Sequence, residues 1–348
     1  MQSSNYEQAS RFMTQDKWNR LSFLKFVACF FIMIFHLDNT FNGIFSQYVP
    51  FFQKYGGYLG NYIFFILSGF CMDYSYHYKL IHEKCSFKKF LFPKLLKIYP
   101  VYFLSLFFFV CVSGLSSVNM KKLILSFAMI SSGWVDDIYP DNAVAWFFSI
   151  ILLLYIIYYF VCFLQSRTDI NIYLPIFIIL AFVGYALYSL KLSYPFMYVH
   201  DGEGLLYFSI GICLSNFMRN YPLKIVKSIS YLGLFILFIY SFLCIKYDAE
   251  TVSGDVGLIC GVMISTIIVI WFLNTSFMPW LFQKLAYFGK ISMEMCLLHL
   301  PLNYIFYNSD LPLENNSAIW FVMYFIILVC ICSVCHVLTV KLRAYRIL

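Results

Sequence analysis

Charged residues are scarce in this sequence, which excludes the usual soluble folds. Asp, Glu, Lys and Arg make up only 12% of the 348 residues, whereas 62% are hydrophobic and 22% are aromatic. A soluble domain of this size cannot enclose so much apolar surface behind so few charges. The apolar runs are also much longer than the strands of a transmembrane barrel. We therefore expect an all-α integral membrane protein that contacts the lipid bilayer and no nucleic acid.

The sequence also gives little indication of disulfides or of a secretion signal. Its 12 Cys residues lie almost entirely within apolar runs, as Cys29, Cys71 and Cys213 do. We interpret them as small buried hydrophobic residues and predict no metal site. The N-terminal stretch is polar, and the first apolar run lacks a small-residue cleavage site. We therefore expect no removed signal peptide.

What the sequence does contain is a series of long apolar segments. One apolar run, Leu123–Ser132, is an exception. It has only about ten residues before Gly133, which is too short to cross a hydrocarbon core of about 30 Å. We expect it to be a re-entrant or interfacial segment within an outer loop of about residues 115–143. Ten segments have the length of transmembrane helices, and they cover residues 20–38, 57–76, 95–114, 144–164, 172–190, 204–218, 228–246, 254–273, 285–307 and 317–340.

The distribution of basic residues predicts the orientation of these segments. With the N-terminus inside and ten crossings, the cytoplasmic parts would hold 19 of the 24 Lys and Arg residues, which is the excess that the positive-inside rule requires. An eleventh crossing at 123–132 would remove this asymmetry. We therefore expect both termini in the cytoplasm. No repeat divides the chain, so we predict a lead-in at 1–19, one transmembrane domain at 20–340 and a tail at 341–348.

The first apolar segment carries a cation and an imidazole on one face. Lys25 and His36 are separated by eleven helical steps, three turns plus about 20°, so their side chains share a face. They would stand roughly 16 Å apart along it. A functional site is one interpretation, because charged groups inside a membrane helix are costly. The alternative, equally open, is structural. Lys25 would then extend to the inner headgroups, and His36 would be hydrogen-bonded at the outer end of the helix.

A strongly basic stretch precedes the third segment. Residues 77–97, HYKLIHEKCSFKKFLFPKLLK, contain six lysines that would lie at the cytoplasmic side. Orientation in the membrane accounts for about half of them under the positive-inside rule. The remainder suit a phosphate-bearing, polyanionic ligand.

Five sequence elements together resemble the acyltransferase 3 family, whose members are multi-pass membrane O-acyltransferases of bacterial surface glycans. Each element is weak by itself, but they occur in the same order as in that family and span most of the chain. They are the basic residue and His at Lys25 and His36, FFILSGF at Phe64–Phe70, KIYPVY at Lys97–Tyr102, AWFFS at Ala145–Ser149 and GKISMEMCLLH at Gly289–His299.

The resemblance implies an activity, and the polar residues described above suggest a site for it. The activity is transfer of an acyl group, usually acetyl, from cytoplasmic acyl-coenzyme A to a hydroxyl of a cell-surface or lipid-linked glycan, in the cell membrane. His36 is then expected to act as general base, with His299 in the substrate tunnel or acceptor site. Homo-oligomers are possible. The residues expected to hold acyl-coenzyme A are Lys25, Lys88, Lys89, Lys94 and Lys97, and Tyr102 and Trp146 are expected to line the substrate path.

Several other polar residues in apolar segments are assigned structural roles. We expect Glu294 to pair with Lys290 one helical turn before it. Asp73 and His77 have the spacing of a structural pair within one helix, and Gly69 has the character of a close-packing residue. Glu203, which precedes an apolar run, is interpreted as a solvated loop charge.

Two other functions fit a chain of many membrane helices. A transporter or flippase of lipid-linked sugars would use the same charges as a substrate path, but it is expected to show inverted repeats and paired broken helices. A glycan polymerase would need a large outer loop. The loop at about residues 115–143 has no Arg, the residue suited to binding the pyrophosphate of a lipid-linked substrate. These functions remain the alternatives to acyl transfer.

Overall fold

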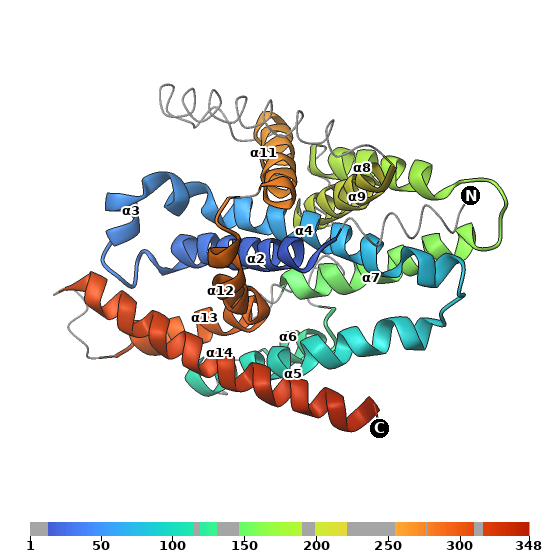
Figure 1. The fold of residues 1–348 in the computed structure, drawn as a ribbon. Helices are drawn as coiled ribbons and strands as arrows, with labels where there is room; N and C mark the ends of the chain where they lie inside the picture. The colour runs from blue at the N-terminus through green and yellow to red at the C-terminus, as the bar shows by residue number, and fades with distance from the viewer. Residues whose placement is uncertain are drawn as a thin grey trace.

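The computed structural model describes residues 13–113, 119–130, 146–189, 199–220, 255–275, 277–309 and 316–347. Within these ranges the regular structure is helical, without a strand (Figure 1). The helices are α2 (Gln15–Leu37), α3 (Ile44–Tyr48), α4 (Pro50–Ile81), α5 (Phe87–Ser113), α6 (Met120–Phe127), α7 (Trp146–Gln165), α8 (Tyr173–Ser189), α9 (Val199–Asn220), α11 (Asp255–Asn274), α12 (Pro279–Lys290), α13 (Ser292–Tyr307) and α14 (Ser317–Ile347).

The helices confirm an all-α membrane protein. Four of them are long and apolar enough to cross a bilayer: Gln15–Leu37, Phe87–Val112, Trp146–Gln165 and Ser317–Ala344. Tyr173–Tyr188 and Gly261–Asn274 are shorter apolar helices. The predicted segment at 228–246 lies outside the described residues.

The described part of the predicted short segment contains a helix that is too short to cross a membrane. α6 has eight residues, Met120–Phe127, and eight residues rise only about 12 Å. Two tyrosines of α5 attach it to that helix, because Tyr99 donates to the Phe127 carbonyl and Tyr102 donates to the Ser126 carbonyl at 2.8 Å.

The predicted segment at 285–307 is not one helix. The structure breaks it at Ile291 (φ −96°, ψ 4°), between α12 and α13. The break follows a very close helix contact, since a Cβ on Gly289 would lie 1.7 Å from the carbonyl oxygen of Ser22. The Ser292 hydroxyl donates to the Gly289 carbonyl at 2.9 Å. Packing of α12 against α2 therefore decides where the helix ends, which an apolar sequence run does not reveal.

α2 and α4 run in opposite directions through the middle of the molecule (Figure 1). Near the start of α2, the rings of Trp18 and Tyr74 lie 5.9 Å apart. Near the end of α2, its side chains lie against Gly57. We call these two ends of the bundle the Lys25 end and the His36 end.

The other helices follow the same axis in both directions. Contacts between them show that α2, α5 and α13 run from the Lys25 end to the His36 end, whereas α4, α7, α9 and α14 run back. α4 and α9 approach very closely, because a Cβ on Gly69 would lie 2.1 Å from the Phe208 carbonyl oxygen. The predicted close-packing role of Gly69 is confirmed.

Candidate active site

Two histidines from distant parts of the chain meet inside the bundle. The rings of His36 on α2 and His299 on α13 have centroids 5.5 Å apart and planes inclined by 40°. His299 is fully buried, whereas His36 is half-buried. The structure thus brings together the two residues that the sequence analysis singled out for chemistry.

Backbone carbonyls fix the orientation of His299. Its Nδ1 lies 3.2 Å from the Met295 oxygen and 2.9 Å from the Cys296 oxygen. Because both partners only accept hydrogen bonds, Nδ1 must carry the hydrogen of the neutral ring. Nε2 then holds a lone pair, and it has no hydrogen-bond partner among the described residues. A buried imidazole with a free lone pair can accept a proton or a hydrogen bond from a substrate hydroxyl.

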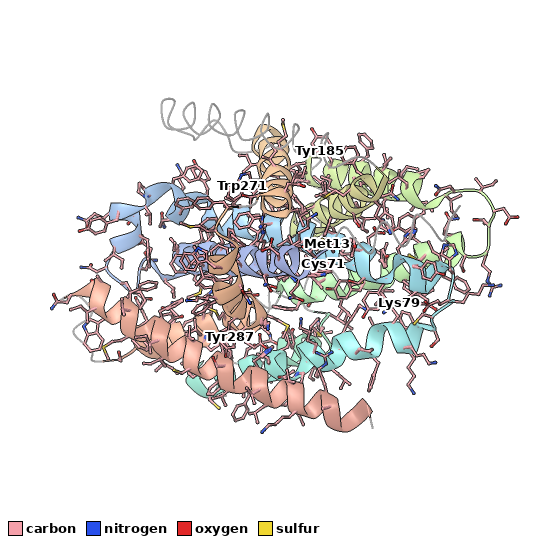
Figure 2. All side chains as sticks on the ribbon, in the orientation of Figure 1. Met13, Cys71, Lys79, Tyr185, Trp271 and Tyr287 are labelled. Atoms are coloured by element: carbon pink, nitrogen blue, oxygen red, sulfur yellow. The ribbon has the colours of Figure 1, made fainter. Side chains whose placement is uncertain are left out.

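A second polar group lies toward the Lys25 end. Lys97 of α5 interacts electrostatically with Lys25 of α2, Glu294 of α13 and Arg343 of α14. We call these four residues the charged cluster. Lys97 also interacts electrostatically with Cys71 of α4, which lies near the centre of the molecule (Figure 2). The side chain of Lys97 is exposed at the surface of α5.

Glu294 pairs with a residue that the sequence analysis missed. Its Oε1 lies 2.8 Å from Nδ1 of His336 on α14. The expected pair with Lys290 is therefore wrong, because the break at Ile291 interrupts the helical register between them. Glu294 lies in the first turn of α13, where the helix dipole stabilises a carboxylate. His336 could have been noticed in the sequence, because a histidine within an apolar run indicates a polar partner inside the bundle.

The predicted donor-binding lysines lie in different surroundings. Lys88 and Lys89 are exposed at the start of α5, and Lys79 lies near the Lys25 end of α4 (Figure 2). The ammonium of Lys94 donates to the Phe90 carbonyl at 2.7 Å and lies 3.6 Å from the ring centroid of Tyr76. Lys94 thus contacts the Phe90 carbonyl and the Tyr76 ring, whereas Lys97 interacts electrostatically with Lys25.

The two polar groups are separated by a distance that a flexible arm can span. Lys25 and His36 differ by eleven residues of one helix, which corresponds to roughly 16 Å. On α13, Glu294 and His299 are five residues apart, about 7.5 Å along the axis. An anion held at the charged cluster could therefore present a reactive group to the histidines.

Tyr102 and Trp146 are packing residues in this structure. Tyr102 is fully buried and its hydroxyl contacts the Ser126 carbonyl. Trp146 is also buried, with its ring 6.3 Å from Phe65 and 6.0 Å from Phe147. Their assignment to a substrate path remains a prediction.

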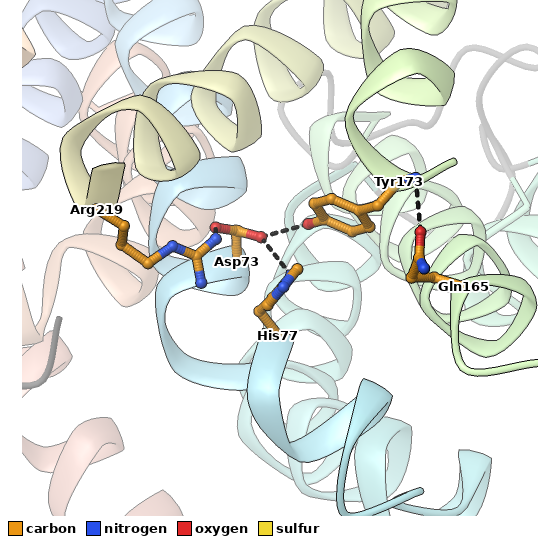
Figure 3. A network of polar contacts seen from close by, with 5 residues as sticks. All are labelled: Asp73, His77, Gln165, Tyr173 and Arg219. Atoms are coloured by element: carbon orange, nitrogen blue, oxygen red, sulfur yellow. Dashed lines mark hydrogen bonds and ion pairs between the residues drawn. The ribbon is translucent and has the colours of Figure 1, made fainter. Parts of the chain in front are cut away.

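A separate buried network surrounds Asp73 (Figure 3). The predicted pair with His77 is confirmed at 3.3 Å, but Asp73 also accepts hydrogen bonds from Arg219 and Tyr173. Gln165 positions Tyr173, since its side-chain oxygen accepts from the Tyr173 backbone at 2.9 Å. The network joins α4, α7, α8 and α9, which supports the structural role expected of Asp73 and His77. Sequence spacing could not find Arg219, which is remote in the chain.

Glu203 is not the solvated loop charge that we expected. It is 4% exposed, within α9, and accepts from the Tyr62 hydroxyl at 3.3 Å. The ring of Tyr62 stacks on Tyr207 with centroids 4.1 Å apart. Helix α9 begins earlier than the apolar run does, so Glu203 is enclosed by neighbouring helices.

One cysteine spacing has no role assigned from the sequence. Cys332, Cys335 and His336 form a C-x-x-C-H sequence, a pattern also found at haem attachment sites. Here both thiols are free and buried in α14, and His336 is engaged with Glu294. No group of three or more His, Cys, Asp or Glu residues has metal-binding geometry in the described part of the chain.

Comparison with known proteins identifies the family. The family profile described as an acyltransferase domain, that of acyltransferase 3, matches residues 18–337. No curated protein and no solved structure gives a significant match to the chain. The matched range runs from Trp18 within α2 to Val337 within α14 and includes both histidines, Lys25, Lys97 and Glu294. The chain is therefore a membrane acyltransferase that belongs to the acyltransferase 3 family.

Proposed function

We propose that the protein transfers an acyl group, specifically acetyl, from cytoplasmic acyl-coenzyme A to a hydroxyl of a cell-surface or lipid-linked glycan. The observation that carries this proposal is the meeting of His36 and His299, with ring centroids 5.5 Å apart, along the same helices that hold Lys25 and Glu294. Lys25 and Lys97 of the charged cluster supply cations for the phosphates of the donor. The histidines supply a proton acceptor at the far end of the donor's arm.

The alternating directions of the helices support the proposed direction of transfer. Helices α2, α4, α5 and α7 alternate in direction along the chain, as the ten-segment topology with both termini in the cytoplasm requires. In this proposal the Lys25 end faces the cytoplasm, where acyl-coenzyme A is available. The His36 end faces the opposite side of the cell membrane and the glycan. Lys88 and Lys89 then guide the polyanionic donor toward the cluster.

The reaction needs one proton acceptor and one thioester. His36 takes the proton of the glycan hydroxyl through a ring nitrogen. The hydroxyl oxygen attacks the thioester carbonyl carbon, the C–S bond breaks, and the coenzyme A thiolate takes up the proton from the His36 imidazolium. His36 is the better base because it is half-buried and accessible. The lone pair of His299 stabilises the imidazolium charge beside it.

The test is acyl transfer from radiolabelled acetyl-coenzyme A in inside-out membrane vesicles. We expect label in glycan with the wild-type protein and none with His36→Ala at equal protein level. Equal label with both proteins would contradict His36 as the base. Absence of label with the wild type, in vesicles that contain the native acceptor, would contradict acetyl transfer to a glycan.

A further inference from the structure

We propose that the surface between α5 and α14 binds one anionic phospholipid, with the phosphate at Arg343 and an acyl chain in an apolar groove. The groove has a volume of about 480 Å³. Its lining residues are Phe92, Leu95, Leu96, Tyr99, Pro100, Phe103, Leu342 and Arg343. We call it the α5–α14 groove. This binding does not depend on the acyl acceptor or on the catalytic role of the histidines.

The floor of the groove is apolar and faces away from the bundle interior. Phe92, Phe103 and Leu342 are exposed, and the α5 lining residues follow the spacing of one helical face. Pro100 lies in this face and cannot donate a hydrogen bond to the Leu96 carbonyl, a change that bends helices. Exposed aliphatic and aromatic side chains of this kind match an acyl chain and not a polar ligand.

One end of the groove carries an unsatisfied cation. Arg343 is half-buried and makes no hydrogen bond or ion pair within the described residues. Arg343 interacts electrostatically with Lys97, a group of the same sign. A partly buried guanidinium without a counterion is costly. An anion beside Arg343 removes that cost.

The ligand must fit both the guanidinium of Arg343 and the apolar groove beside it. A phosphate offers oxygens for the two-pronged contacts that a guanidinium prefers. The glycerol and acyl chains of the same molecule then fill the adjoining apolar groove. Basic pockets between membrane helices bind anionic lipids in this way.

The test measures lipid retained by the purified full-length protein. The protein is equilibrated with equal amounts of phosphatidylglycerol and phosphatidylcholine, and retained lipid is counted by native mass spectrometry. We expect phosphatidylglycerol to be retained in preference. Arg343→Gln should weaken its retention about fivefold, the effect of one cation near a membrane surface. Lys341→Gln is the matched control, because Lys341 is an exposed cation of the same helix outside the groove, and it should leave retention unchanged.

A second pair of variants tests the groove itself. Leu96→Trp fills the groove and should reduce phosphatidylglycerol retention, whereas Val337→Trp, which adds an indole to an exposed position outside it, should not. Equal retention of the two lipids, or no difference between Arg343→Gln and Lys341→Gln, would overturn the proposal. Displacement of the lipid by added acetyl-coenzyme A would also overturn it, because the anion at Arg343 would then be the acyl donor.

Discussion

The imidazole of His299 lies beside that of His36, and its Nδ1 is held by two carbonyl oxygens of its own helix. The two rings come from opposite ends of the chain. Neither helix holds the pair alone, so the site exists only when α13 packs in parallel beside α2. The break at Ile291 permits this packing, because α12 turns against α2 at Ser22 before α13 begins.

The histidines should act as a unit. In His299→Asn, the side-chain amide can still donate to the Met295 and Cys296 carbonyls, but the lone pair of Nε2 is lost. We expect acyl transfer to fall by about 10²-fold or more in this variant and in His36→Asn, the contribution of a general base. The double variant should lose no more than the worse single one. Single losses that multiply in the double variant would contradict joint action, and thermal unfolding would show that all three proteins are folded.

Lys97 should matter more for donor affinity than Lys88 does. Lys97 belongs to the charged cluster, whereas Lys88 is exposed at the start of α5. We expect Lys97→Gln to weaken acetyl-coenzyme A binding about tenfold, the loss of one hydrogen bond to a charged group. Titration of the purified protein with the donor by calorimetry measures this effect. Equal affinity of the wild type, Lys97→Gln and Lys88→Gln would contradict a donor site at the cluster.

The Asp73 network should stabilise the fold without taking part in the reaction. Arg219→Met leaves the buried carboxylate without its main counterion, which costs about 3 kcal/mol or more. Tyr173→Phe removes one hydrogen bond and should cost about 1 kcal/mol. We therefore expect the thermal unfolding midpoint to fall much more for Arg219→Met than for Tyr173→Phe. Transfer per folded molecule should stay near the wild-type value for Tyr173→Phe, and a large loss there would give the network a functional role.

Gly289 should tolerate no side chain. A methyl group would overlap the Ser22 carbonyl, so Gly289→Ala must push α12 away from α2 and should cost about 1–3 kcal/mol, as overpacked cores do. Lys290→Ala, the adjacent exposed position, should be nearly neutral because Glu294 pairs with His336. Thermal unfolding of both variants measures the contrast. A stability loss in Lys290→Ala as large as in Gly289→Ala would mean that Lys290 and not His336 neutralises Glu294.

The sequence by itself determined the class of the protein and much of its site. Long apolar segments with few charges require helices in a bilayer, because lipid offers no hydrogen-bond partners to other backbone conformations. The short length of α6 and the pair of Asp73 with His77 were also predictable, since both depend on residues close together in the chain. His36, His299 and Lys97 could be singled out because polar groups stand out in apolar helices.

Only the tertiary structure decided which polar groups meet. The partner of Glu294 is His336, Arg219 joins Asp73, and Glu203 is enclosed by Tyr62, all across different helices. Lys94 and Lys97 differ by less than one turn, yet one packs against Tyr76 and the other faces Lys25. Such pairings depend on the rotation and spacing of whole helices, which close contacts at Gly69 and Gly289 set. Hydropathy determines that a helix lies in the membrane. Side-chain packing determines which face of the helix contacts each neighbouring helix.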